Sequence, residues 1–194
     1  MIKTIYFDFD GVIAISESGG KAVAQNLSPL IGVPVDKISE TFYKTGKSFL
    51  SGEDSVETFL EKFSQALGKE VTIENLASAY CKVPLNKKLI ELIEKFKEKY
   101  SVELITNNNL FRFQMLQERN LLDVWQVFNK VHISSEKNKP KQQFIFELGE
   151  PSEALLIDNN QKFLNQVAEK GMKTLLFDSL KNDIVYLEKE INRI

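Results

Sequence analysis

The first apolar run of the chain ends in two aspartates, and this feature limits what the N-terminal segment can form. Residues 5–7 (Ile-Tyr-Phe) lead directly into Asp8, Phe9, Asp10 and Gly11. A short run of β-branched and aromatic residues bounded by glycine predicts a strand buried on both faces. Side chains alternate along a strand, so Asp8 and Asp10 would project to the same side. Two such carboxylates repel each other and lose solvation, so the pair needs a cation, a proton or a donor and is a candidate site.

Four further apolar runs resemble the first, and helical patterns separate most of them. The runs cover residues 102–105, 131–133, 155–157 and 175–177. The stretch after Ser179 predicts a C-terminal helix with Ser179 as its N-cap. Alternating strand and helix patterns favour an α/β fold, a Rossmann-like parallel sheet with helices on both faces.

The segment between the first two strands predicts a separate helical insertion. Its roughly 90 residues are too many for a simple crossover, and most of them show helical patterns without a strand signal. Residues 54–67 are amphipathic and precede Gly68, a candidate C-cap, and Thr72 could cap the next helix. We therefore expect a small all-helical cap at 16–83, inserted after the first strand of a catalytic core formed by 1–15 and 84–194.

Composition excludes several classes of protein. The formal charge of −2 and the pI near 5.6 give no electrostatic footprint for nucleic acid. The single cysteine, Cys81, cannot form an internal disulfide, which agrees with a reducing compartment. The chain shows no signal-peptide pattern at its start, and no apolar stretch approaches the length that a spanning helix requires. These features predict a cytoplasmic globular protein without a membrane partner, as a monomer or homodimer.

Polar side chains follow most of the predicted strands, where parallel sheets bind their ligands. Besides Asp8 and Asp10, these are Thr106 and Asn107 after the second run, Ser134 and Ser135 with the nearby Lys139 after the third, and Asp158, Asn159 and Asn160 after the fourth. These residue types suit phosphoryl transfer. A carboxylate can act as nucleophile, a second can move a proton, and a hydroxyl and a lysine can hold phosphoryl oxygens. Mg²⁺ binds through one or two carboxylates with phosphate and water.

Taken together, these motifs resemble those of the haloacid dehalogenase (HAD) superfamily of phosphohydrolases. Its four motifs match, in order, residues 8–12 (Asp-Phe-Asp-Gly-Val), residues 104–107 (Leu-Ile-Thr-Asn), Lys139 with Pro140, and residues 155–158 (Leu-Leu-Ile-Asp). The helical insertion after the first motif resembles that family's cap of the first type. The matches cover nearly the whole chain.

The resemblance implies a role for each motif residue. Asp8 would be the nucleophile and Asp10 the general acid and base, while Thr106 and Lys139 would hold the transferring phosphoryl group. Asn107 and Gly11 would join Thr106 and Lys139 in binding the substrate, a small phosphorylated metabolite. Asp8, the Asp10 backbone carbonyl and the fourth motif (Asp158 and Asn159) would bind Mg²⁺. Asp10 argues against the dehalogenase branch, which generally lacks an acid there.

One departure from the family pattern leaves alternatives open. Asn159 stands where the fourth motif usually carries its metal-binding acid, so metal binding would be weaker unless Asp158 compensates. The first rival to a working phosphatase is therefore a catalytically impaired HAD-fold protein that binds a ligand or partner. The second is a phospho-accepting signalling receiver. Such a receiver would have adjacent acids on its first strand and no long helical insertion, so the sequence fits it poorly. The single His132, within a predicted strand, is assigned a structural role.

Overall fold

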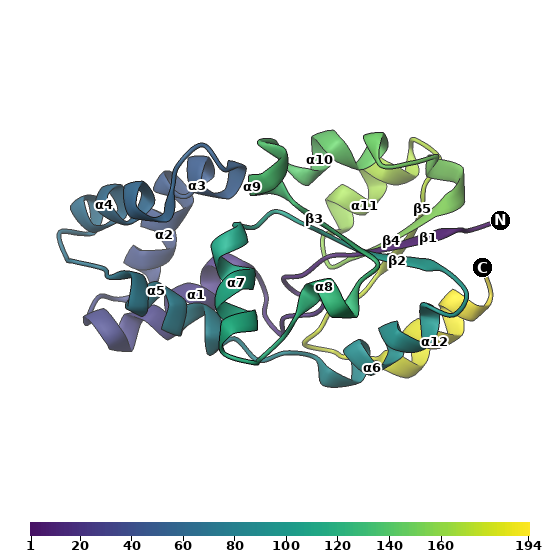
Figure 1. The fold of residues 1–194 in the computed structure, drawn as a ribbon, viewed down its shortest axis with the longest axis horizontal. Helices are drawn as coiled ribbons and strands as arrows, with labels where there is room; N and C mark the ends of the chain where they lie inside the picture. The colour runs from purple at the N-terminus through teal and green to yellow at the C-terminus, as the bar shows by residue number, and fades with distance from the viewer.

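The computed structural model describes all 194 residues, and its centre is a sheet of five parallel strands (Figure 1). The strands are β1 (Thr4–Phe7), β2 (Ser101–Thr106), β3 (Lys130–Ile133), β4 (Ala154–Asp158) and β5 (Lys173–Leu176), in the spatial order β3-β2-β1-β4-β5. Phe7 at the end of β1 pairs with Leu104 on one side and Ile157 on the other. This register brings the residues after β1, β2 and β4 to one edge of the sheet. The predicted α/β fold with a parallel sheet is confirmed.

Helices cover both faces of the sheet because the central strands β1 and β4 are buried on both sides. On one face lie α6 (Lys87–Phe96), α7 (Leu110–Glu118), α8 (Val124–Val127) and α12 (Ile184–Asn192), which share a buried cluster with Phe7, Leu104 and Ile157. On the other face lie α10 (Lys141–Phe144) and α11 (Gln161–Ala168), packed on alternate strand residues such as Tyr6, Ile105 and Leu156. The short α9 (Ser134–Lys137) and two 3₁₀ turns, η1 (Ile145–Glu147) and η2 (Pro151–Glu153), complete the core.

The last helix begins later than the sequence predicts. Its N-cap is Asp183, whose side chain accepts from the Tyr186 amide, and not Ser179. Ser179 is buried instead, where its hydroxyl donates to the Ala14 carbonyl and accepts from the Ser16 amide. A serine hydroxyl satisfies backbone groups in loops as readily as at helix starts, and here it ties the C-terminal segment to the loop after β1.

Five of the helices between β1 and β2 pack around a core of their own, and we call this group the cap. They are α1 (Gly19–Ile31), α2 (Val35–Thr45), α3 (Lys47–Ser51), α4 (Val56–Leu67) and α5 (Ile73–Cys81). The buried cluster inside them centres on aromatic residues, with Phe49 stacked on Phe59 at 4.3 Å between ring centroids. The helix ends predicted from the sequence are present. Gly68 ends α4 in the left-handed conformation, and Thr72 at the start of α5 forms a capping box with Asn75. The cap lies beyond the carboxyl ends of the strands, opposite both termini (Figure 1).

The cap touches the core at several places, which include an ion pair between Glu74 of α5 and Arg119 at the end of α7. Where the chain enters and leaves the cap, the Ile15 amide donates to the Pro84 carbonyl at 2.8 Å. On the far side, two core side chains donate to the backbone of α3: Asn109 to the Phe49 carbonyl at 2.7 Å and Ser134 to the Leu50 carbonyl at 2.6 Å. These contacts hold the cap over the end of the sheet. None of the helices has the length and apolar character needed to cross a bilayer.

Candidate active site

The loop after β1 places Asp8 at the end of the sheet. The carbonyl of Phe9 accepts hydrogen bonds from the amides of Ile13 and Ala14, which folds the loop tightly. Gly11 has a φ of 80°, and a Cβ there would lie 1.9 Å from the Asn159 amide nitrogen. This position therefore requires glycine for both its conformation and its close contact with the strand β4 end. Gly11 has no side chain, and its predicted role in substrate binding stays a prediction.

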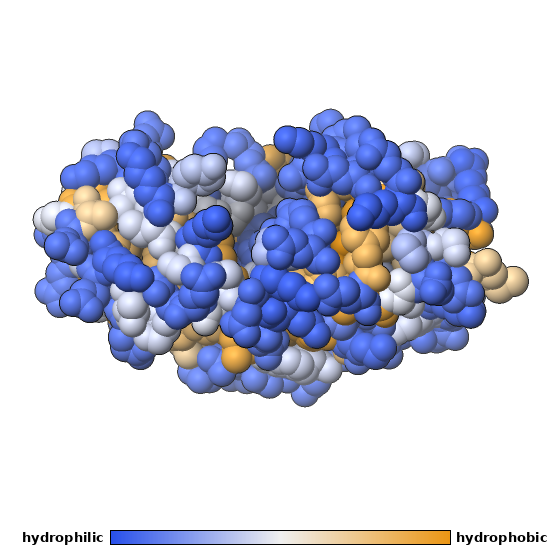
Figure 2. Space-filling view, turned by 90° about the horizontal axis from the view of Figure 1, so that it is seen from above, coloured by the Kyte–Doolittle hydropathy of each residue, from blue (hydrophilic) through white to orange (hydrophobic).

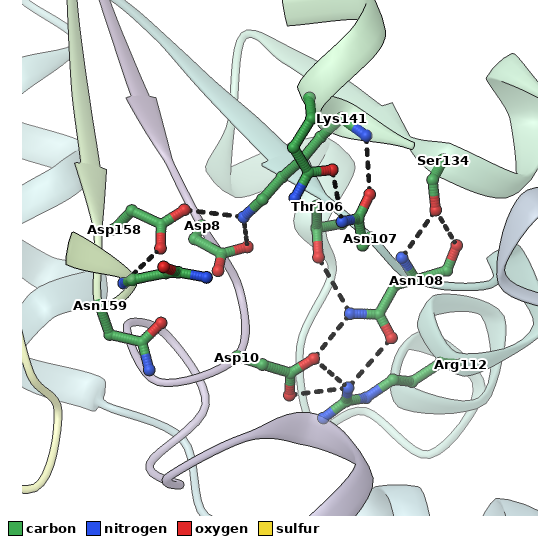
Figure 3. A network of polar contacts seen from close by, with 12 residues as sticks. Asp8, Asp10, Thr106, Asn107, Asn108, Arg112, Ser134, Lys141, Asp158 and Asn159 are labelled. Atoms are coloured by element: carbon green, nitrogen blue, oxygen red, sulfur yellow. Dashed lines mark hydrogen bonds and ion pairs between the residues drawn. The ribbon is translucent and has the colours of Figure 1, made fainter. Parts of the chain in front are cut away.

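Asp8 belongs to a buried group of three charges, which we call the site cluster: Asp8, Lys141 and Asp158 (Figure 3). Lys141 Nζ lies 2.8 Å from Asp8 Oδ1 and 2.8 Å from Asp158 Oδ2. Burial raises the pKa of Asp8 to about 7, although Lys141 opposes the rise. Burial alone would lower the pKa of Lys141, but the two carboxylates raise it above its ordinary value. With both acids ionised the cluster carries one net negative charge, and Asp8 Oδ2 has no hydrogen-bond partner.

The structure places Lys141, and not the predicted Lys139, beside Asp8. Lys139 lies on the surface and pairs with Glu147. Lys141 is the first residue of α10, and its amide donates to the Asn107 side chain at 2.7 Å. That contact directs the lysine inward over the ring of Phe163, 5.2 Å from the centroid. Asn107 thus anchors the helix that delivers the lysine, and its own amide donates to Gln142.

The residues after β2 connect to the second aspartate. Thr106 is buried, and its hydroxyl accepts from the Asn108 side-chain amide at 2.9 Å. The same amide donates to Asp10 Oδ2 at 2.8 Å. Arg112 Nη1 lies 2.9 Å and 2.8 Å from the two oxygens of Asp10 (Figure 3). Asp8 and Asp10 therefore have different partners, a lysine for the first and an arginine with an amide for the second.

Sequence reasoning missed Asn108, Arg112 and Lys141. The signal for Arg112 is present in the chain, because a charged residue stands among Leu110, Phe111 and Phe113 in a helix that packs on the sheet. A single arginine in an apolar stretch predicts either a buried ion pair or a site. Lys141 gives a weaker signal, because it closes a run that also contains Lys137 and Lys139.

The donors around Asp8 fit a hard divalent cation. Asp158 is fully buried, and its Oδ1 accepts from the Asn160 amide at 2.7 Å. Asn159 lies against Gly11 and donates to the Glu17 carbonyl at 3.3 Å, which leaves its side-chain oxygen without a partner. No hydrogen bond uses the carbonyl oxygen of Asp10. An all-oxygen set with excess negative charge is what Mg²⁺ takes in proteins.

A polar cavity of about 630 Å³ joins these groups between the core and the cap. The core contributes Asp8, Asp10, Thr106 and Lys141, and the cap contributes residues that include Tyr80 and Phe42. Figure 2 shows that the surface is hollowed between the cap and the sheet, with hydrophilic residues around the hollow. This volume lies within the range of small-molecule sites.

The comparisons with known proteins fall into two kinds. No family model matches the sequence, and no curated protein matches it either. Solved structures do match over nearly the full chain. A predicted HAD-like family hydrolase from Porphyromonas gingivalis is 23% identical, covers 98% of both chains and gives a TM-score of 0.81.

Two further solved structures are similar over most of the chain. A HAD family enzyme from Bacteroides thetaiotaomicron, in complex with magnesium and inorganic phosphate, is 20% identical over 96% of this chain and 99% of its own, with a TM-score of 0.78. L-2-haloacid dehalogenase from Xanthobacter autotrophicus is 16% identical over 99% of this chain and 83% of its own, with a TM-score of 0.63. The chain therefore has the fold of the HAD-like hydrolases, as its motifs predict.

Proposed function

We propose that the protein is a Mg²⁺-dependent phosphatase that hydrolyses a small organic phosphoester through an aspartyl-phosphate intermediate. The observation that carries this proposal is the site cluster. Asp8 is buried, has one free oxygen facing a polar cavity and lies beside a lysine that can hold a phosphoryl oxygen. A carboxylate in this setting can form a covalent intermediate. Residues 16–83 would act as the cap, and 1–15 with 84–194 as the catalytic core.

The first step would transfer the phosphoryl group to Asp8. A free oxygen of Asp8 attacks phosphorus, the bond from phosphorus to the ester oxygen breaks, and Asp10 gives a proton to that oxygen as the alcohol leaves. Lys141 and the Thr106 hydroxyl would hold the phosphoryl oxygens, where charge develops. Lys141 takes the place that the motif resemblance gave to Lys139.

The second step would return Asp8 to its starting state. Asp10, now ionised, takes a proton from a water molecule, whose oxygen attacks phosphorus. The bond between phosphorus and Asp8 breaks, and inorganic phosphate is released. In general acid–base catalysis, a group that donates a proton in one step can accept a proton in the next.

Mg²⁺ would be held by Asp8, the Asp10 carbonyl, Asp158 and the side-chain oxygen of Asn159. When bound, it supplies positive charge that neutralises the phosphoryl oxygens. The charges of the site account for the need for a cation, because two buried carboxylates face one ammonium group. The bound magnesium and phosphate in the B. thetaiotaomicron enzyme support this assignment for a protein of the same fold.

Asp10 favours phosphate esters over organohalides as substrates. An alcohol leaving group needs a proton, whereas a halide leaves without one, so an acid beside the nucleophile serves only the ester. The similarity in fold to a haloacid dehalogenase does not bear on this point, because the same fold supports both chemistries.

The direct test compares the wild type with Asp8→Asn on a panel of phosphorylated metabolites with Mg²⁺. We expect the wild type to release phosphate, and the variant to lose this activity while keeping its circular dichroism spectrum and unfolding midpoint. Beryllium fluoride, which mimics a phosphoryl group on a carboxylate, should bind the wild type and not the variant. Turnover by Asp8→Asn would contradict the covalent mechanism. A wild type that turns over no ester would instead support a binding protein with an impaired site.

A further inference from the structure

Arg112 is buried in a setting that uses only part of its hydrogen-bonding capacity. It is 1% exposed, and its guanidinium carbon lies 4.7 Å from the centroid of the Phe9 ring and 5.1 Å from that of Tyr80. All its hydrogen bonds come from Nη1, to Asp10 and to the Asn108 side-chain oxygen. Nε is buried without a partner, and Nη2 takes part in none of the hydrogen bonds that Arg112 makes within the protein. Unsatisfied buried donors are rare and costly, so this arginine has donors to offer a ligand.

Tyr80 covers Arg112 from the cap and is also unsatisfied. It belongs to α5, is 2% exposed, and its hydroxyl has no hydrogen-bond partner. Burial raises the pKa of Tyr80, with Asp10 adding to the rise and Arg112 opposing it, so the hydroxyl keeps its proton at neutral pH. Tyr80 and Arg112 both line the cavity that contains Asp8 and Asp10. Two elements far apart in the chain thus bring unpaired donors to the same side of the site.

We propose that Arg112 and Tyr80 form the leaving-group subsite, which binds an oxygen atom on the carbon next to the ester carbon. This inference rests on the proposed function, in which Asp10 protonates the ester oxygen. Nη1 of Arg112 holds Asp10, and Nη2 is its neighbour on one rigid planar group. An acceptor atom bound to Nη2 and to the Tyr80 hydroxyl would therefore lie beside the ester oxygen that Asp10 protonates. The preferred substrates are phosphate monoesters of vicinal diols and of α-hydroxy carbonyl compounds.

Arg112 has a second effect in this arrangement, as a positioning residue for Asp10. Its contacts to both carboxylate oxygens fix the plane of that group. Because one guanidinium touches both the acid and the leaving group, substrates with the neighbouring oxygen would align with Asp10 better than substrates without it. An ester that lacks this oxygen leaves the donors of Arg112 and Tyr80 unpaired, and sites built for hydrogen bonding reject such analogues strongly.

The test uses two esters of equal size that differ in one group, 2-hydroxyethyl phosphate and n-propyl phosphate. We expect the wild type to prefer the first roughly 10- to 100-fold in kcat/KM, the range for hydrogen bonds from charged groups. Tyr80→Phe should reduce this ratio about 2- to 10-fold, as one neutral hydrogen bond is lost. Arg112→Met should bring the ratio near one and also lower kcat on both esters, and Arg112→Lys should restore part of the ratio. Tyr43→Phe and Arg193→Met, both on the surface outside the cavity, should keep the wild-type ratio.

A binding measurement separates this inference from the proposed function. The dissociation constants of the two esters are measured with Asp8→Asn, alone and combined with Tyr80→Phe, so no turnover is needed. Tighter binding of the hydroxyl ester that is weakened by Tyr80→Phe supports the subsite even if no ester is hydrolysed. Equal affinities and equal kcat/KM values for the two esters would overturn it, and so would a ratio that survives both Tyr80→Phe and Arg112→Met. Phosphate release without such a preference would leave the phosphatase proposal standing alone.

Discussion

The sheet holds two clusters of buried charged groups, and they differ in how well each carboxylate is satisfied. One of them, which we call the strand cluster, consists of Glu103 on β2 and its partners. Glu103 accepts from His132 at 2.7 Å and from Ser101 at 2.9 Å, and Lys130 lies 3.3 Å away. Burial would raise the pKa of Glu103, but these partners, His132 first, lower it below its ordinary value. In the site cluster, burial prevails and the pKa of Asp8 rises.

The difference agrees with a structural role for the strand cluster and with the catalytic role that we propose for the site cluster. Both oxygens of Glu103 have partners, and Lys130 matches its charge. His132 thus has a structural role, as the sequence suggests. Asp8 keeps one free oxygen, and its cluster has more acid than base. A buried charge left uncompensated in this way is unfavourable in the folded protein and becomes favourable only when a ligand supplies the missing partner.

The largest effect is expected from removing the lysine of the site cluster. Lys141→Met should lower kcat/KM on phosphoesters by about a thousandfold, in the range seen when a group that stabilises developing charge is lost. Lys139→Met is the matched control two residues away, and its activity should stay within about twofold of the wild type, since surface ion pairs contribute little. Steady-state kinetics with both variants decide the matter. Loss of activity in Lys139→Met with a normal Lys141→Met would restore the original motif assignment.

Much of this architecture could be predicted from the sequence, because strand positions and strand ends follow from short apolar runs. Asp8, Asp10, Thr106 and Asp158 lie at strand ends, so their meeting at one edge of the sheet was predictable. The lysine was not, because Lys139 and Lys141 both lie beyond the end of β3, in a short loop and the first turn of α10. Contacts between residues far apart in the chain distinguish them, among them the hydrogen bond from the Lys141 amide to Asn107.

The pairing of Asp10 with Arg112 could not be predicted for a related reason. Strand alternation suggests that Asp8 and Asp10 share a partner, but β1 ends at Phe7 and the chain turns before Asp10. The second aspartate therefore faces α7 and the cap. The sequence shows that Arg112 is a charged residue in an apolar stretch, but it does not predict which residue Arg112 contacts.

The strand cluster should affect stability and leave the chemistry unchanged. Glu103→Gln should lower the free energy of unfolding at pH 7 by about 1.5–3 kcal/mol, the range for hydrogen bonds to a charged group. Its kcat should match the wild type, because Glu103 does not line the cavity. Urea unfolding and kinetics on the same samples test both parts. A large fall in kcat with little loss of stability would show that the two clusters are coupled.

The stability that Glu103 contributes should fade in acid. A carboxylate with a lowered pKa binds its proton less readily in the folded state, so its contribution is present above the unfolded pKa, near 4.5, and is lost as the pH falls through the folded value. The gap in unfolding free energy between the wild type and Glu103→Gln should therefore shrink between pH 6 and pH 3. A gap that stays constant over this range would mean that the packing of the side chain, and not its charge, stabilises the strands.

The smallest expected effect comes from adding a charge to the site cluster at Asn159. The Asn159 side chain supplies an oxygen without negative charge, so Asn159→Asp would increase the Coulomb attraction for Mg²⁺. We expect about tenfold tighter Mg²⁺ binding, measured both as the Mg²⁺ concentration for half-maximal rate and as Mg²⁺-dependent stabilisation against heat. Without the metal the variant should be less stable than the wild type, because a further acid lies close to Asp8 and Asp158. If rate and thermal stabilisation both kept their wild-type dependence on Mg²⁺, Asp158 would carry the metal and position 159 would only pack against Gly11. If the wild type showed no turnover and the variant gained some, the protein would be a ligand-binding relative whose site lost its activity through this single amide.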